Sequence, residues 1–145
     1  MISINKVNTK KLERALKEYR DDAIIEVKGV NLDTASTISA NAKKNVSVDR
    51  GTLRNSIRVD ETDKINYRVG TNLPYAPYIE FGTGRKVVVP PEFKDLALKA
   101  RKNKGQMTNG MDAKPFFYPA FVQGRRSYNK EMKKAFERLS KKFKR

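Results

Sequence analysis

Two short motifs could take part in phosphodiester chemistry. Glu26-Val27-Lys28 and Glu92-Phe93-Lys94 match the acid-x-Lys fragment of metal-dependent nucleases, in which carboxylates hold a metal beside the reacting phosphate. The first motif lies inside a predicted helix, whereas this chemistry needs carboxylates that converge at strand ends. Such tripeptides also arise by chance among 16 acidic and 32 basic residues. We therefore assign neither motif to a metal site or to catalysis.

A glycine-rich segment, Gly82-Thr83-Gly84-Arg85-Lys86, superficially resembles a phosphate-binding loop. It lacks the G-x-x-x-x-G-K-[ST] spacing and follows no clear strand, so it predicts a turn that ends at glycine. A second turn is predicted at Asp49-Arg50-Gly51. We expect Gly51 and Gly82 to form these turns, with a positive φ that glycine tolerates best.

The missing residue types exclude several further functions. The 145 residues contain no Cys and no His. Disulfides, a thiol nucleophile, a Cys/His zinc site and any Ser-His arrangement are therefore excluded. We expect no enzyme, no cofactor and no metal site. No apolar run approaches 20 residues, and the N-terminus lacks the apolar region of a signal peptide, which predicts a non-secreted protein without a membrane span.

The formal net charge of +16 admits a nucleic acid, an acidic protein or an anionic membrane surface as partner. Half of it lies between Arg125 and Arg145, where ten basic and two acidic residues give +8. The basic side chains in this segment are candidates for contact with DNA or with a partner protein. Those we single out are Arg125, Arg126, Lys130, Lys133, Lys134, Arg138, Lys141 and Lys142.

The pattern of apolar residues predicts a single α+β domain over residues 1–145. A long helix is expected from about 8 to 46, with a kink or break near Gly29 to Asp33. Alternating residues predict an antiparallel hairpin with strands at about 53–60 and 65–71. A short helix near 75–81, an extended basic connection over 85–114 and an amphipathic C-terminal helix follow.

Apolar stripes indicate which faces of the two long helices are buried. Small residues in the second half of the first helix would let another element approach closely. The first stripe comprises Leu12, Leu16, Tyr19, Ala23, Val27, Val30, Ala35, Ile38, Ala42 and Val46. The stripe of the last helix comprises Tyr128, Met132, Ala135, Phe136, Leu139 and Phe143.

Two proline-flanked aromatic clusters, at residues 74–81 and 115–121, could stack bases, but such clusters beside a sheet more often form core or subunit contacts. Glu80 lies inside the first cluster. If buried, its carboxylate needs an Arg or a backbone N–H as partner, and Arg54 and Arg58 are the candidate arginines. The aromatic residues that we assign to core or subunit packing are Tyr75, Tyr78, Phe81, Phe116 and Phe117.

Three sequence blocks, taken in order, resemble those of a known family. They read VDRGTLRNSI at residues 48–57, VGTN followed by PYAPYIEFGTG at 69–84, and AKPFFYPA at 113–120. Together they are similar to the small neck, or tail-completion, proteins of long-tailed bacteriophages, which join head to tail. The connection over 85–112 is longer than in the shorter family members.

The resemblance implies a non-enzymatic virion protein with an α+β fold. Such a protein is assembled in the host cytoplasm and forms a homo-oligomeric ring, usually of six subunits, at the neck of the virion. Its neighbours would be the connector or stopper and the tail-tube proteins, with non-specific contact to passing DNA and none to a membrane. The alternative is a free-standing basic nucleic-acid-binding module that uses the C-terminal helix.

Overall fold

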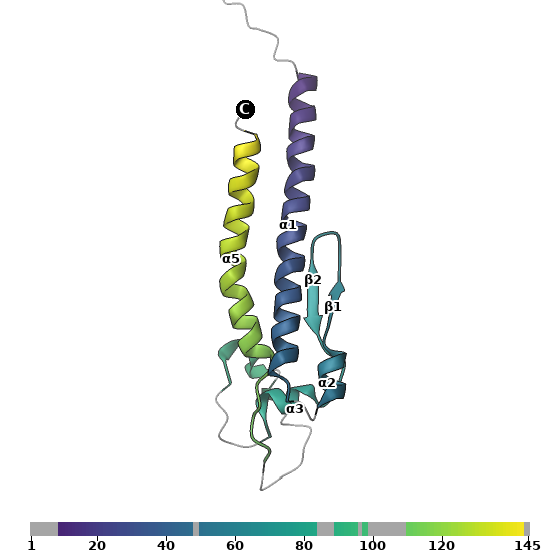
Figure 1. The fold of residues 1–145 in the computed structure, drawn as a ribbon, viewed down its shortest axis with the longest axis vertical. Helices are drawn as coiled ribbons and strands as arrows, with labels where there is room; N and C mark the ends of the chain where they lie inside the picture. Colours follow the sequence, from purple (N-terminus) through teal and green to yellow (C-terminus); the bar gives the residue numbers. More distant parts are fainter. Residues whose placement is uncertain (1–8, 48–49, 84–88, 96, 99–109, 144–145) are drawn as a thin grey trace, which may run out of the picture.

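The computed structural model describes residues 9–47, 50–83, 89–95, 97–98 and 110–143. Two long helices, α1 (Thr9–Asn45) and α5 (Phe117–Lys142), lie side by side (Figure 1). These helices and a small antiparallel sheet confirm the predicted α+β class. The remaining elements are α2 (Gly51–Ser56), β1 (Arg58–Glu61), β2 (Tyr67–Gly70), α3 (Ala76–Phe81) and the 3₁₀ helix η1 (Pro91–Phe93).

Helix α1 is continuous through Gly29, so of the kink or break predicted near Gly29 to Asp33 the break is wrong. Contacts with the hairpin account for this continuity. Lys28 Nζ donates to Glu61 Oε1 at 2.9 Å, and Asn31 Nδ2 donates to the Ile65 carbonyl at 2.7 Å. The Asn31 side chain therefore does not compete for the helix backbone, and tertiary contacts outweigh the roughly 1 kcal/mol that a helical glycine costs.

The predicted antiparallel hairpin is present, but its first strand is shorter than expected. β1 pairs with β2 from Arg58 opposite Gly70 to Glu61 opposite Tyr67. Residues 51–56, which the alternation assigned partly to the strand, form α2 instead. Leu53 and Ile57 are four residues apart, and both are completely buried. This spacing also fits one face of a helical turn, so alternation over a few residues could not separate the two structures.

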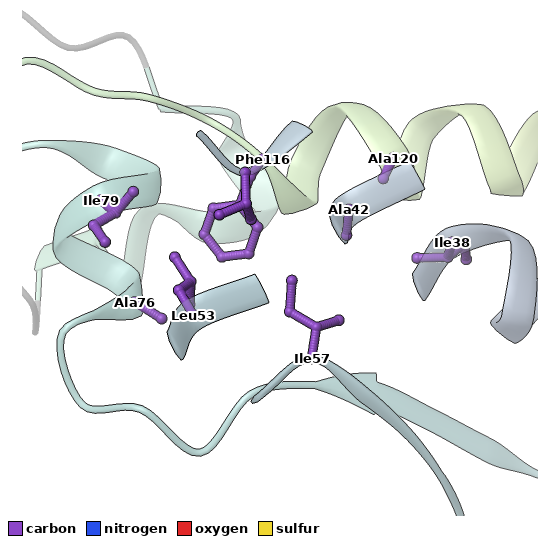
Figure 2. Close-up of a cluster of buried hydrophobic side chains, with 9 residues drawn as sticks. Ile38, Ala42, Leu53, Ile57, Ala76, Ile79, Phe116 and Ala120 are labelled. Atoms are coloured by element: carbon purple, nitrogen blue, oxygen red, sulfur yellow. The ribbon is translucent and has the colours of Figure 1, made fainter. Parts of the chain in front are cut away.

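The core lies at one end of the molecule, where α1, α2, α3 and the start of α5 meet. Figure 2 shows the Phe116 ring beside Ile79 of α3 and Leu53 of α2. Ala42 and Ala120 let the two long helices approach closely beside this ring. Among the small residues of this half of α1, Ala35, Ser39 and Ala42 are buried, whereas Ser36 and Ala40 are exposed. The core cluster comprises Ile38, Ala42, Val46, Leu53, Ile57, Ala76, Ile79, Phe116 and Ala120.

The apolar stripe of α1 is buried only in its second half. Val30 and Ile38 are buried, whereas Leu12 and Leu16 are 53% and 59% exposed. Figure 1 shows α1 extending past the end of α5, so no described element covers these leucines. Near that end, Tyr19 contacts Phe143 edge to face, with ring centroids 4.9 Å apart. The first part of α1 therefore presents apolar side chains to its surroundings.

In the C-terminal helix, Ala135 and Leu139 are buried while Phe136 is 50% exposed. Its predicted stripe is therefore only partly buried against α1. Just over half of the predicted 85–114 connection (85–88, 96 and 99–109) lies outside the described residues. Over the described ranges, no helix is both long and apolar enough to cross a membrane.

Candidate functional site

The Glu80 carboxylate caps the N-terminus of α5. Its Oε2 accepts hydrogen bonds from the backbone N–H groups of Phe116 and Phe117, and its Oε1 accepts one from Tyr118, all at 2.8 Å. A helix begins with four N–H groups that have no partner inside the helix. Here the fourth position is Pro119, which has no N–H. One carboxylate from α3 thus satisfies every unpaired donor at this helix end.

Burial and charge both favour this cap. Glu80 is only 7% exposed, and a negative charge at a helix N-terminus interacts favourably with the helix dipole. The backbone N–H partner expected for a buried Glu80 is present. Neither expected arginine is its partner, because Arg58 pairs with Asp60 at 3.4 Å and Arg54 is exposed on α2.

The segment before α5 is bound along the end of α3. Thr83 N–H donates to the Met111 carbonyl at 2.9 Å, and Met111 N–H donates to Thr83 Oγ1 at 2.7 Å. Lys114 N–H donates to the Ile79 carbonyl at 2.8 Å. With the Glu80 cap, these bonds form a continuous backbone connection that we call the α3–α5 clasp (residues 79–83 with 111–118). The clasp holds the start of α5 in register with α3.

The two glycines predicted to form turns differ. Gly82, which ends α3, has φ of 64°, and a Cβ atom there would lie 2.6 Å from the Met111 carbonyl oxygen. Glycine is therefore needed both for the backbone conformation and for the approach of the clasp. Gly51 is the first residue of α2 and has no positive φ, so the left-handed turn predicted there is wrong.

The aromatic residues assigned to packing fall into two groups. Phe81 and Phe116 are buried at 5% and 3% exposure, whereas Tyr75 is 39% exposed. Tyr78 and Phe117 are half-buried. The first two thus belong to the interior, while Tyr75 is accessible for contact with another molecule.

Phe93 is the aromatic residue whose role the sequence did not indicate. Its ring centroid lies 6.1 Å from that of Phe81, 5.4 Å from Tyr118 and 6.4 Å from Phe121. It therefore links α3 to α5 through edge and tilted ring contacts, which stabilise aromatic clusters. The preceding Pro90-Pro91 starts the short η1 helix that places this ring, but no periodicity in the sequence connects Phe93 to either cluster.

Two adjoining apolar hollows, of about 300 and 510 Å³, lie between β2, η1 and α5. They share the side chains of Val69, Phe93 and Phe117. The acidic residue that lines the first is Glu80, which is occupied by the helix cap. The second hollow is also lined by polar side chains, among them Asn31, Tyr67 and Arg68, and Asn31 is hydrogen-bonded to the Ile65 carbonyl.

The acid-x-Lys motif of α1 is divided between two ion pairs. Arg138 Nη2 lies 2.6 Å from Glu26 Oε2, and Lys28 pairs with Glu61. These hydrogen bonds raise the pKa of the Arg138 guanidinium and of the Lys28 ammonium. Among the described residues, no three Asp or Glu side chains are grouped to hold a metal ion.

The basic residues of α5 divide according to the face they occupy. Arg138 and Lys142 pair with Glu26 and Asp22 of α1, and Lys134 pairs with Glu131 on α5 itself. The others are exposed and form no ion pair with any residue that the structure describes. They are Arg125, Arg126, Lys130, Lys133 and Lys141.

Comparison with known protein families shows where the chain belongs. A family described as "Bacteriophage HK97-gp10, putative tail-component" matches residues 6–82, which is more than half of the chain. The matched region runs from α1 to the end of α3 and stops before α5. No curated protein and no solved structure matches the chain.

Proposed function

Because the chain belongs to the HK97-gp10-like family of bacteriophage tail components, we propose that it forms a ring at the virion neck. In this position it joins the connector or stopper of the DNA-filled head to the tail tube. The family match over residues 6–82 carries the proposal. The AKPFFYPA block at 113–120, beyond that match, supports the head–tail joining role through its resemblance to tail-completion proteins.

The surface of the chain is suited to contacts between copies. Leu12 and Leu16, one turn apart on the first half of α1, are both more than half exposed. Neighbouring apolar side chains that are exposed on a protein surface are typical of interfaces with other proteins. Tyr75 directly precedes α3, which lies at the opposite end of the molecule from the start of α1 (Figure 1), and offers an aromatic contact there.

A ring requires each copy to present two different surfaces, one to each neighbour. We propose that the first half of α1 contacts one neighbour and the end that carries Tyr75 contacts the next. Six copies are expected, as in the proteins that the sequence blocks resemble. The ring would assemble in the host cytoplasm as head and tail are joined.

Deletion of the gene from a phage that encodes this chain tests the proposal. DNA-filled heads and complete tails should accumulate unjoined, and purified protein added to the lysate should restore infectious particles. Cryo-electron microscopy of the restored particles should then show the chain as a ring at the neck. Joined, infectious virions that lack the protein would contradict the proposal.

A pair of variants tests the surface of α1. Leu12→Ser with Leu16→Ser should abolish restoration of infectivity while leaving the urea unfolding midpoint unchanged, because both side chains are exposed. The control is Arg14→Ser with Lys17→Ser, exposed residues of the same helix turns, which should restore infectivity normally. Equal activity of the two double variants would exclude this surface from the ring contact.

A further inference from the structure

The outer face of α5 is a stripe of four cations directed away from α1. Arg126, Lys133 and Lys141 each lie two positions from a buried residue, at Gly124, Ala135 and Leu139. Two positions correspond to about 200° around a helix axis, so these side chains point outward. Lys130, three residues before Lys133, belongs to the same stripe, which extends over about 22 Å of helix. We call these four residues the outer cationic stripe.

No acidic residue that the structure describes is ion-paired with the cations of the stripe. All four residues are exposed. Arg138 and Lys142, by contrast, are occupied by acidic residues of α1. The structure thus separates cations that hold the two helices together from cations that remain available. An uncompensated stripe of this kind attracts a polyanion.

The other residues of the outer face distinguish among polyanions. Between the cations lie the polar and acidic side chains of Asn129, Glu137 and Ser140, and the half-exposed Phe136 borders the stripe on one side. Protein interfaces have an apolar, aromatic-rich centre and are depleted in Lys, so this face does not resemble one. Single-strand binders stack successive bases on several aromatic side chains, whereas Phe136 is a lone ring at the edge of this face. A mainly polar face with four cations fits the phosphate backbone of a duplex.

We propose that the outer cationic stripe binds the backbone of double-stranded DNA without sequence preference. Three of its four cations are lysines, which act as hydrated point charges rather than as fork-shaped ligands for base edges. The inference adds a DNA-contacting surface to the proposed neck protein, but the purified chain can be tested without any ring. Failure of DNA binding would thus be distinguishable from failure of the neck assignment.

The chain offers a closely matched pair of triple variants. The α5 triple variant removes one Arg and two Lys at positions i, i+4 and i+7 of that helix, by Arg126→Gln, Lys130→Gln and Lys133→Gln. The α1 triple variant is the control and removes the same residue types at the same spacing on α1, by Lys10→Gln, Arg14→Gln and Lys17→Gln. Both triples are exposed and lower the net charge equally. They therefore differ only in which surface loses its charge.

Fluorescence anisotropy with a 30-base-pair duplex at several salt concentrations is the measurement. Each phosphate neutralised contributes about 0.9 to the slope of log K against log salt concentration. The α5 triple should make this slope shallower by about 2.7 and weaken binding at low salt, whereas the α1 triple should change neither. Scrambling the duplex sequence should have no effect.

Three results would overturn the inference. Equal losses in both triples would mean that DNA responds only to the total charge. No duplex binding by the wild-type chain at low salt would exclude the surface altogether. Binding of polyglutamate but not of duplex, lost in the α5 triple, would assign the stripe to an acidic protein partner instead.

Discussion

Gly124 of α5 lies directly against Ile38 of α1. A Cβ atom placed on this glycine would be 2.3 Å from Ile38 Cγ1 and 2.7 Å from Ile38 Cδ1, far inside van der Waals contact. The missing side chain is therefore what lets the two long helices meet at this point. Because Gly124 faces α1, the opposite side of α5, which carries the outer cationic stripe, faces away from α1.

Gly124→Ala should lower the free energy of unfolding by about 1–3 kcal/mol, because overpacking at a tight helix crossing forces side chains out of their rotamers. This loss should appear although alanine is the better helix former. Gly29→Ala is the matched control, because no atom lies within 4 Å of its added Cβ in the same pair of helices. It should stabilise the protein by up to about 1 kcal/mol.

Urea unfolding followed by circular dichroism measures both changes. Replacing Ile38 by Ala should make Gly124→Ala cost less, because the clashing Cγ1 and Cδ1 atoms are then absent. If Gly124→Ala stabilised the chain as Gly29→Ala does, the crossing of α1 and α5 described above would be wrong.

Much of this fold follows from local sequence pattern, since a 3.6-residue or two-residue period needs no knowledge of distant contacts. The long helices and the hairpin are predicted in this way, and the short α3 helix is predicted from the proline and glycine residues that bound its aromatic segment. The break expected at Gly29 is absent, because Lys28 and Asn31 bind hairpin residues that lie more than 30 positions further along the chain. Local propensity contains no information about such contacts.

In the candidate site, too, local sequence predicts some features, whereas contacts between distant residues are not predicted. Burial of Glu80 is foreseeable from its aromatic neighbours, but its partners are not, because the donors lie 36 to 38 residues further along the chain. Phe93 is missed for the same reason. The basic residues of the last helix are visible in the sequence, but only the structure separates Arg138, paired with Glu26, from the unpaired Lys133.

Gly82→Ala should destabilise the protein by at least about 2 kcal/mol, because it adds left-handed strain to a backbone clash. The Cβ atom would meet the Met111 carbonyl oxygen and the Ala113 nitrogen, neither of which can rotate away as a side chain can. Gly70→Ala is the control, since its Cβ has no neighbour within 4 Å. Hydrogen exchange at the Thr83 and Lys114 amides should accelerate only in the Gly82 variant. Unchanged exchange there would contradict the role of Gly82 in the clasp.

Glu80→Ala should lower the free energy of unfolding by about 2–4 kcal/mol, because it leaves three backbone donors at a buried helix end without a partner. Glu80→Gln should lower the free energy of unfolding by less than Glu80→Ala does. Its one side-chain oxygen can still accept a hydrogen bond, although its NH₂ group would face a backbone N–H that needs an acceptor. Glu92→Ala, an exposed glutamate in η1, is the control and should stay within about 0.5 kcal/mol of wild type. Denaturant unfolding of the three variants gives the comparison, and equal stabilities for Glu80→Ala and Glu92→Ala would contradict the cap.

The hairpin turn should loosen in acid through Asp63. Hydrogen bonds from the Ile65 N–H and from the side chain and N–H of Asn66 lower the pKa of this carboxyl group. Because the folded pKa lies below the unfolded one, the stabilisation is complete above the unfolded pKa and is lost as the pH falls through the folded pKa. The amide NMR signals of Ile65 and Asn66 should therefore shift with a common midpoint below the usual aspartate pKa of about 3.9. Asp63→Asn should abolish that titration, and a midpoint at or above the usual value would show that the carboxylate does not hold this turn.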